Sequence, residues 1–411
     1  MNLVKFKINL LLIVLFFISF STEGFDIASA LTFLFIPFIN FKNIVILFKN
    51  SLLFKTLFIF YIFCFVSIAT NKYEINQGVR FFSTFLLFIY ISSNKLFNGI
   101  LFIKYLKIII YGLLIQNIIA LYLVFVKGII VIPGFKPFLL SFRYQGFYNL
   151  TILAIFLSAL LLCILATRNL LKSLIIKILV YLFFPICIVL SLTRSAWLVF
   201  CIGIFFLILF ESNFRISNFF KYIKVIGVLF FIIGVCFSIS AIFITSEYDI
   251  SDLLKNRIFN DTIEKSNNAE IERGNFTYPL TLIKKIGIRP FGIGLGQTEK
   301  IGGHIFSTEE GNLGSHNTFA QILLDFGFLP FVFFISFNFL LIINFIQNFN
   351  DIRQSYIYGC FIGFLALFFG AMYQDLVIYL PIAIFPIFSI CYFLFSNQTC
   401  TSKTNSTKIL F

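Results

Sequence analysis

Residues 174–210 read LIIKILVYLFFPICIVLSLTRSAWLVFCIGIFFLILF, two apolar runs separated by only Thr193 and Arg194. An α-helix needs about 20 predominantly apolar residues to cross the hydrocarbon core of a bilayer, and both runs approach that length. Neither run shows the alternation of apolar and polar residues expected for the strands of a membrane barrel. Because backbone groups in lipid must be paired within the protein, the stretch predicts two membrane helices joined by a tight turn.

The rest of the chain repeats this pattern. Of its 411 residues, 60% are hydrophobic and 12% are charged, against about 25% charged residues in a soluble domain, so a soluble fold is excluded. We predict an all-α fold, a polytopic helical bundle in which residues 1–411 form a single membrane domain. The twelve predicted membrane spans are residues 8–20, 27–40, 52–69, 80–93, 105–126, 149–166, 174–192, 195–210, 223–245, 328–347, 356–373 and 377–396.

Lysine and arginine are distributed unequally between the two predicted sides of the membrane. With the amino terminus inside, the inner connections receive seventeen of these residues and the short outer connections receive six. The positive-inside rule therefore predicts that both termini are cytoplasmic. The formal charge of +14 is scattered over helix ends and forms no patch, which favours membrane lipids over nucleic acid as the partner.

One segment, residues 246–326, is too long and too polar for a simple connection between spans nine and ten. It contains eleven of the seventeen acidic residues and both histidines. By helix parity it is an outer, periplasmic loop. Arg273 opens an apolar-periodic stretch that ends before Pro290, which predicts a short helix on the membrane surface.

Alternate glycines follow this predicted helix, in the sequence Phe291-Gly-Ile-Gly-Leu-Gly-Gln297. Backbone amides at glycines can approach an anion closely, so Gly292, Gly294 and Gly296 are candidates for phosphate binding. No predicted strand precedes them, which excludes a dinucleotide fingerprint. A plain tight turn is the alternative interpretation.

His316 stands at the point where the loop re-enters a predicted helix, within Ser315-His-Asn-Thr-Phe319. An imidazole has an ordinary pKa of about 6.5, which suits a general base at neutral pH. A capping or surface histidine is the alternative. The only other histidine, His304, lies in a glycine-rich stretch.

Arginines are predicted at the outer membrane edge: Arg194 in the tight turn, Arg143 before the sixth span and Arg80 at the start of the fourth. Ionisable groups at such positions are functional candidates, and guanidinium forks match phosphate oxygens. Charges that snorkel to the interface are the alternative. Asp375, in the last outer turn, could orient a base, pair with an arginine or serve the turn.

No group of His, Cys, Asp and Glu has the spacing of metal ligands, and no Walker lysine motif is present. The sequence therefore predicts chemistry without a metal or cofactor. Seven of the eight cysteines lie in apolar segments and none lies in the large loop, so no disulfide framework is expected.

Several of these motifs together resemble the O-antigen polymerase and O-antigen ligase superfamily. The resemblance is carried by the Thr193–Ala196 turn, the Arg143/Gly146/Asn149 spacing, Arg273 upstream of Pro290 and the glycines, and Ser315–Thr318. It implies a glycosyltransferase in a bacterial inner membrane. The substrate it implies is a lipopolysaccharide oligosaccharide carried on undecaprenyl pyrophosphate and used at the periplasmic face.

The resemblance also implies roles for single residues. His316, Arg273 and Arg194 would be catalytic: the histidine takes the proton of the acceptor hydroxyl, and the arginines stabilise the charge on the leaving group. Inversion at the anomeric carbon is expected, since no carboxylate pair suits a covalent intermediate. The residues assigned to substrate or pyrophosphate binding are Arg143, Arg80, Arg289, Gly292, Gly294, Gly296, Asn317 and Asp375.

Three functions fit these features, and we prefer the first. A polymerase transfers the growing glycan from its lipid carrier onto a new lipid-linked repeat unit, with a chain-length regulator protein as a possible partner. A ligase transfers the finished glycan onto the lipid A core. A transporter of the same glycans is the third; transporters place binding residues near the midplane and often contain repeats, whereas here the polar candidates lie at the outer edge, midplane charges are nearly absent and no repeat is visible. The sugar, its linkage and the oligomeric state are beyond the sequence.

Overall fold

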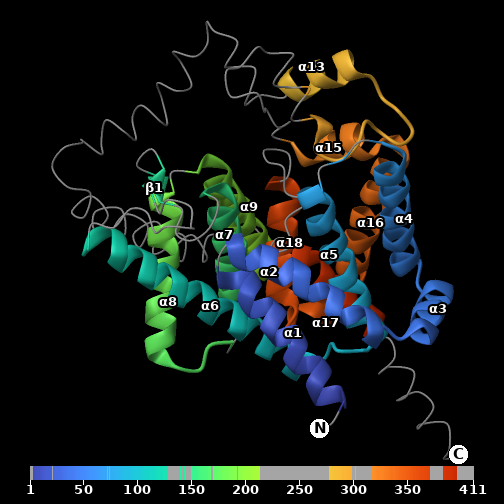
Figure 1. Ribbon diagram of the computed structural model, residues 1–411. Helices are drawn as coiled ribbons and strands as arrows, with labels where there is room; N and C mark the ends of the chain where they lie inside the picture. Colours follow the sequence, from blue (N-terminus) through green and yellow to red (C-terminus); the bar gives the residue numbers. More distant parts are fainter. Residues whose placement is uncertain are drawn as a thin grey trace, which may run out of the picture.

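A computed structural model describes most of the predicted bundle. The described residues are 3–20, 22–71, 73, 75–127, 139–140, 143–144, 150–167, 170–191, 193–212, 277–298, 301, 317–370 and 383–395. In this part of the chain the regular structure is helical, apart from one hairpin of two-residue strands (Figure 1). The prediction of an all-helical membrane fold is confirmed to that extent.

The elements follow one another in chain order. The first group is α1 (Leu3–Phe20), α2 (Thr22–Thr32), the 3-10 helix η1 (Phe33–Phe38), α3 (Phe41–Asn50), α4 (Leu52–Thr70), α5 (Ile75–Ser93) and α6 (Gly99–Phe125). The second is β1 (Leu139–Leu140), β2 (Arg143–Tyr144), α7 (Leu150–Ala166), α8 (Leu174–Leu190) and α9 (Arg194–Glu211). The third is α13 (Thr277–Ile286), α15 (Thr318–Gln321), the π-helical η5 (Ile322–Phe326), α16 (Phe328–Gln347), α17 (Phe349–Arg353), α18 (Tyr358–Gly370) and a last helix, Ala383–Phe395.

Eleven of the twelve predicted spans coincide with described helices, and the twelfth, 223–245, lies outside the described residues. By length and composition, α1, α4, α6 and α16 can cross a membrane, and several other apolar helices are shorter. The count of twelve spans therefore stays a prediction. The short helix predicted before Pro290 is confirmed as α13.

Two connections differ from the prediction. Residues 41–50, expected as an inner loop, form α3, because Phe41, Ile44, Val45 and Phe48 recur at helical spacing. Backbone bonds pair β1 with β2 in a region expected to be loop, with Leu140 opposite Arg143. A short antiparallel pair satisfies backbone groups that would otherwise need water.

Contacts at the two ends of the bundle show that successive helices run in opposite directions. At the amino-terminal end, where α1 begins, Lys7 Nζ donates to Phe38 O (3.4 Å) and Asn43 Nδ2 donates to Ser93 O (2.6 Å). At the opposite end Arg80 Nε lies 2.9 Å from Asp26 Oδ1. This second end carries α13 and α15 (Figure 1), and we call it the loop end.

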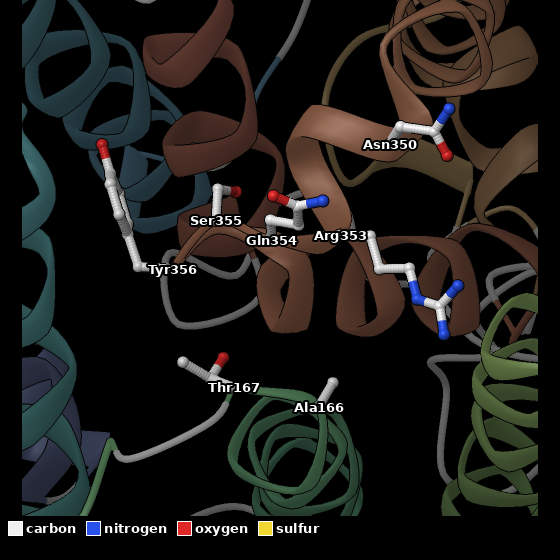
Figure 2. A pocket seen from close by; sticks show the side chains of 7 residues that line it. All are labelled: Ala166, Thr167, Asn350, Arg353, Gln354, Ser355 and Tyr356. Atoms are coloured by element: carbon white, nitrogen blue, oxygen red, sulfur yellow. The ribbon is translucent and has the colours of Figure 1, made fainter.

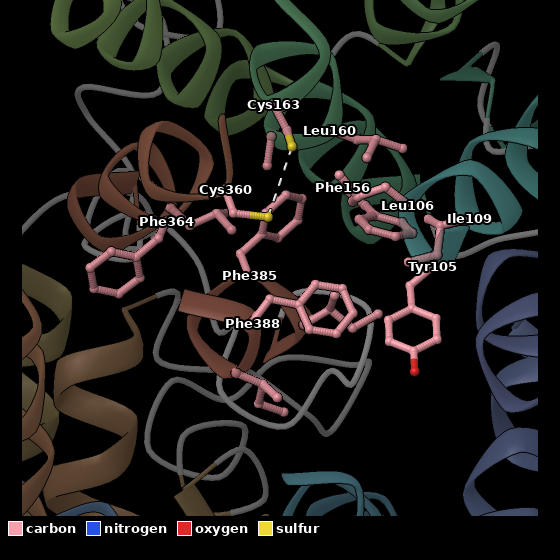
Figure 3. Packing of buried hydrophobic residues seen from close by; sticks show 14 of the residues in the cluster. Tyr105, Leu106, Ile109, Phe156, Leu160, Cys163, Cys360, Phe364, Phe385 and Phe388 are labelled. Atoms are coloured by element: carbon pink, nitrogen blue, oxygen red, sulfur yellow. Dashed lines mark hydrogen bonds between the residues drawn. The ribbon is translucent and has the colours of Figure 1, made fainter. Parts of the chain in front are cut away.

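The core between α7 and α18 depends on small residues. A Cβ added to Gly359 would lie 2.2 Å from Cys163 O, and one added to Gly363 would lie 3.1 Å from Ala159 O. Small residues four apart let membrane helices approach closely. Figure 3 shows the buried thiols of Cys163 and Cys360 facing each other across this interface, 3.9 Å apart, with Phe385 and other aromatic rings packed below them.

Candidate functional site

The loop end is built from two segments far apart in sequence, residues 289–298 and 317–327, which we call the loop-end unit. Ile293 N donates to Leu324 O (2.9 Å) and Gly294 N donates to Asp325 O (3.0 Å). Phe328 N, at the start of α16, donates to Arg289 O (2.9 Å). The chain leaving the large predicted loop is thereby bonded to the glycine-rich stretch that follows α13.

A buried carboxylate lies at the centre of the loop-end unit. The side chain of Asp325 is fully buried, and its Oδ2 accepts from Gly296 N at 3.2 Å. Its Oδ1 accepts from Thr298 N at 3.0 Å and from Thr298 Oγ1 at 2.5 Å. Burying a carboxyl group without hydrogen-bond partners is costly, and these three donors satisfy it.

The three glycines have the backbone conformation that the turn requires. Gly292, Gly294 and Gly296 have φ values of +66°, +109° and +78°, a region that side chains disfavour. A Cβ on Gly292 would also lie 2.3 Å from Asp325 O. Gly294 N donates to the backbone carbonyl of Asp325 and Gly296 N donates to its side-chain carboxylate, so two amides of the predicted cradle have acceptors within the chain itself. Pyrophosphate binding by these glycines stays a prediction.

Helices α4 and α5 fix the loop-end unit to the bundle. Ser67 Oγ donates to Phe291 O at 2.6 Å and lies 3.2 Å from Asp325 O. Asn71 Nδ2 also donates to Phe291 O, at 3.0 Å. From α5, the ring of Phe81 packs 4.9 Å from that of Phe326. The unit is therefore held by hydrogen bonds and aromatic packing to two helices of the bundle.

Asn317 begins α15. Its Oδ1 accepts from Ala320 N at 3.0 Å, so the side chain caps the helix, and the residue is buried. The predicted helix start directly after His316 is confirmed. The predicted role of Asn317 in substrate binding stays a prediction beside this capping role.

Arg80 has an acidic partner within the chain. Its Nε and Nη2 lie 2.9 and 3.2 Å from the two carboxylate oxygens of Asp26, a bidentate pair that is partly exposed. Phe81, the next residue, contacts Phe326, which places this pair beside the loop-end unit. Binding of pyrophosphate by Arg80 stays a prediction, and it would compete with Asp26.

Arg194 is the first residue of α9. Helix α18 connects α9 to the loop end, because it packs against both α9 and α15. Gly370 ends α18, and a Cβ there would lie 2.2 Å from Val199 Cγ2. Near the same end of α18, the ring of Phe368 lies 5.6 Å from that of Phe319 in α15. The end of α18 thus contacts both the helix that Arg194 starts and the helix that follows His316.

A tryptophan braces the tight turn at Arg194. Trp197 Nε1 donates to Ile188 O in α8 at 3.3 Å. This bond joins the end of α8 to the first turn of α9. Arg143, another of the three arginines predicted at the outer edge, lies in β2, which contacts α8. The side chains of Arg143 and Arg194 lie outside the described part of the structure.

Of the remaining predicted site residues, the structure describes Arg289. His316, Arg273 and Asp375 lie outside the described residues, as does His304. Arg289 is exposed and contributes its carbonyl oxygen to the loop-end unit. Their roles stay predictions.

Asp325 and Asp26 were missed by the sequence interpretation. A signal for Asp325 was present, because an acidic residue in the apolar run Gln321-Ile-Leu-Leu-Asp-Phe326 is costly in a membrane segment and is a functional candidate by default. Asp26 gave no such signal. Its partner Arg80 is 54 residues away in sequence.

One pocket lies away from the loop end. It has a volume of about 550 Å³ and is lined by Ala166, Thr167, Asn350, Arg353, Gln354, Ser355 and Tyr356 (Figure 2). Arg353 pairs with Glu211 at 3.1 Å, and Glu211 ends the helix that Arg194 begins. With a rise of about 1.5 Å per residue, α9 separates this pocket from Arg194 by about 25 Å.

These features define a class, the multi-pass helical membrane proteins with a hydrogen-bonded loop unit at one end of the bundle. Residues 178–335 match the family model described as O-antigen ligase. The match covers less than half of the chain and includes Arg194, Arg273 and His316. It confirms the predicted resemblance to the O-antigen ligase and polymerase superfamily. No curated protein matches the chain.

Proposed function

We propose that this protein is an O-antigen polymerase, a glycosyltransferase that extends a glycan carried on undecaprenyl pyrophosphate. Members of the matched family act on lipid-linked glycans. The observation that carries the proposal is the extent of the match, because residues 178–335 contain all three residues assigned to catalysis from the sequence. The reaction would take place at the loop end, which we assign to the periplasmic face.

The proposed reaction is a single displacement. His316 takes the proton of the acceptor hydroxyl, and that oxygen bonds to the anomeric carbon of the donor glycan. The bond from this carbon to the pyrophosphate oxygen breaks, and undecaprenyl pyrophosphate leaves. Arg194 and Arg273, with Arg143, stabilise the charge on the departing phosphate, since guanidinium forks bind such oxygens bidentately. The configuration at the anomeric carbon is inverted.

The described geometry supports a shared location for these groups. Helix α13 begins four residues after Arg273, α15 begins two residues after His316, and the two helices are in contact. Leu282 of α13 and Leu324 of η5 form a small buried cluster with Ile283 and Ile286. The segments that follow the proposed catalytic residues are therefore packed together at one end of the bundle.

Asp325 has a positioning role in this proposal. Its carboxylate joins the stretch after α13 to the helix that follows His316, through Gly296 and Thr298. It touches no reacting atom in the proposed mechanism. The bonds it makes would keep the distance between the Arg273 and His316 segments constant during the displacement.

O-antigen ligase is the second candidate, because the description of the matched family names that activity. A ligase would use the same base and the same arginines with the lipid A core as acceptor. The choice of acceptor is the difference between the two reactions.

The test uses the purified full-length protein with synthetic undecaprenyl-pyrophosphate-linked repeat units. We expect extension of the glycan, and a loss of at least about 100-fold in His316→Ala and in Arg273→Ala, the usual effect of removing a general base or charge stabiliser. Lys284→Ala, an exposed residue of α13, is the matched control and should keep full activity. Retained extension in both site variants contradicts the mechanism, and transfer only to a lipid A core acceptor assigns a ligase.

A further inference from the structure

Helix α3 lies between two crossings of the bundle. The chain runs from Asp26 at the loop end through α2 and η1 to Phe38 at the amino-terminal end, where Phe38 O accepts from Lys7. With rises of about 1.5 and 2.0 Å per residue, α2 and η1 together extend about 28 Å, close to the thickness of a hydrocarbon core. Helix α4 then returns to the loop end, where Ser67 bonds to the loop-end unit.

The geometry of α3 sets it apart from these crossings. Its axis is bent by 92° from the preceding helical segment. Only two residues separate it from η1, and Ser51 alone separates it from α4, whose first turn Ser51 caps by accepting from Phe54 N (3.2 Å). Since the segment before α3 runs from the loop end to the amino-terminal end and α4 runs back, α3 lies at the amino-terminal end, and its 92° bend sets it across the preceding segment.

The surface of α3 divides into three strips. One strip packs on the bundle: Leu47 is buried and Asn43 bonds to Ser93 O. A second strip is apolar and exposed, with Phe41 at 69%, Val45 at 52% and Phe48 at 36% exposure. These residues are four and three positions apart and therefore share one side of the helix.

The third strip is basic. Lys42 and Lys49, seven residues apart, are both exposed and lie on one line along α3, beside the apolar strip. The helix contains no acidic residue. A helix with an apolar strip bordered by lysines has the character of segments that lie in the interface of a membrane with anionic lipids.

We infer that α3 is an in-plane anchor that binds anionic phospholipid at the membrane surface around the amino-terminal end of the bundle. The strip formed by Phe41, Val45 and Phe48 enters the acyl boundary, and Lys42 and Lys49 contact lipid phosphates. The positive charge of the helix and its place between two segments that run the length of the bundle both favour a lipid surface as the occupant. This inference is independent of the glycosyl transfer proposed above.

The test exploits the single tryptophan of the chain, Trp197. A reporter is placed by Val45→Trp in a Trp197→Phe background, and the full-length protein is reconstituted in nanodiscs with brominated phosphatidylcholine or brominated phosphatidylglycerol. We expect both lipids to quench the reporter, with a higher relative binding constant for phosphatidylglycerol. Each lysine at the membrane surface should raise the binding constant for phosphatidylglycerol relative to phosphatidylcholine about fivefold. The double variant Lys42→Gln with Lys49→Gln should return this ratio of binding constants to about one.

A matched control is Lys172→Gln with Lys177→Gln, two lysines around the start of α8. It removes the same charge elsewhere and should leave the ratio at the reporter unchanged. A reporter that neither lipid quenches would place α3 away from the bilayer and overturn the inference. Equal quenching by the two lipids with both lysines present overturns the anionic preference. Shielding of the reporter together with a doubled particle mass assigns the apolar strip to a second copy of the chain.

Discussion

The α7–α18 interface and the loop-end unit hold distant segments together by different means. Between α7 and α18 the contact is apolar, and Gly359 and Gly363 allow the helices to approach closely. In the loop-end unit a single carboxylate, that of Asp325, accepts from Gly296 and Thr298. Apolar packing spreads its free energy over many atoms, whereas the polar unit depends on a small number of directional hydrogen bonds, three of which meet at one carboxylate.

The strongest test of this contrast removes the carboxylate. Asp325→Ala leaves the amides of Gly296 and Thr298 and the Thr298 hydroxyl without this acceptor in a buried site, and should cost about 3–5 kcal/mol in the free energy of unfolding. Thermal unfolding in detergent and limited proteolysis between α13 and α15 measure the effect. Thr298→Val keeps both amide bonds and should cost only about 1–3 kcal/mol. Equal stability of Asp325→Ala and the parent would contradict the central role of the carboxylate.

A pair of glycine substitutions separates backbone conformation from close approach. Gly287 and Gly292 both have positive φ, but a Cβ on Gly287 meets no atom within 4 Å. Gly287→Ala should therefore lower the free energy of unfolding only by the cost of placing alanine in the left-handed conformation, about 1–2 kcal/mol. Gly292→Ala adds a steric clash between the new Cβ and Asp325 O, and should lower the free energy of unfolding by about 1–3 kcal/mol more. Chemical denaturation of the two variants side by side is the measurement, and equal losses would contradict the close packing.

The apolar interface is tested at Gly359. A Cβ there meets the backbone oxygen of Cys163, so Gly359→Ala must push α7 and α18 apart, at a cost of about 1–3 kcal/mol. Gly363→Ala meets its nearest neighbours at 3.0–3.1 Å and should cost less. The difference in thermal midpoint between the two variants is the readout. A larger drop in thermal midpoint for Gly363→Ala than for Gly359→Ala would show that the helices are closer at Gly363.

The smallest effect is expected at the ion pair of the loop end. Asp26 is 56% exposed, so Asp26→Asn should change the free energy of unfolding by less than about 1 kcal/mol. In the proposed polymerase the same change would release Arg80 and lower the KM for the lipid-linked donor. Steady-state kinetics and unfolding of Asp26→Asn check the two expectations, and a raised KM would show that Asp26 does not compete with the donor.

The membrane helices could be predicted because the bilayer imposes one solution on apolar runs, and α4 and α9 begin and end within one residue of the predicted limits. The helix after His316 was also predictable, since Asn317 is a strong capping residue. Helix α3 escaped prediction because ten residues between two spans fit a loop equally well. The bonds between Asp325 and Gly296 escaped it because they join residues 29 positions apart.

The sequence was enough to choose candidate site residues, because their residue types and their positions relative to the predicted spans could be read from it. The partners of these residues could not be predicted. The sequence predicts Arg80 at the start of a span, but its pairing with Asp26 depends on how α2 packs against α5. The amides of the glycine stretch show the same limit. Alternate glycine amides suggest an anion site, and only the fold shows that Asp325 accepts from two of them, through its backbone carbonyl at Gly294 and its carboxylate at Gly296.

The single tryptophan of the chain, Trp197, gives it an optical property. A single indole fluoresces in the whole protein, and it lies in the first turn of the helix that Arg194 begins. Its emission wavelength depends on the polarity around the ring and on its hydrogen bond to Ile188 O. Any ligand that reorganises the Arg194 turn would therefore shift an intrinsic signal, without a dye or a label.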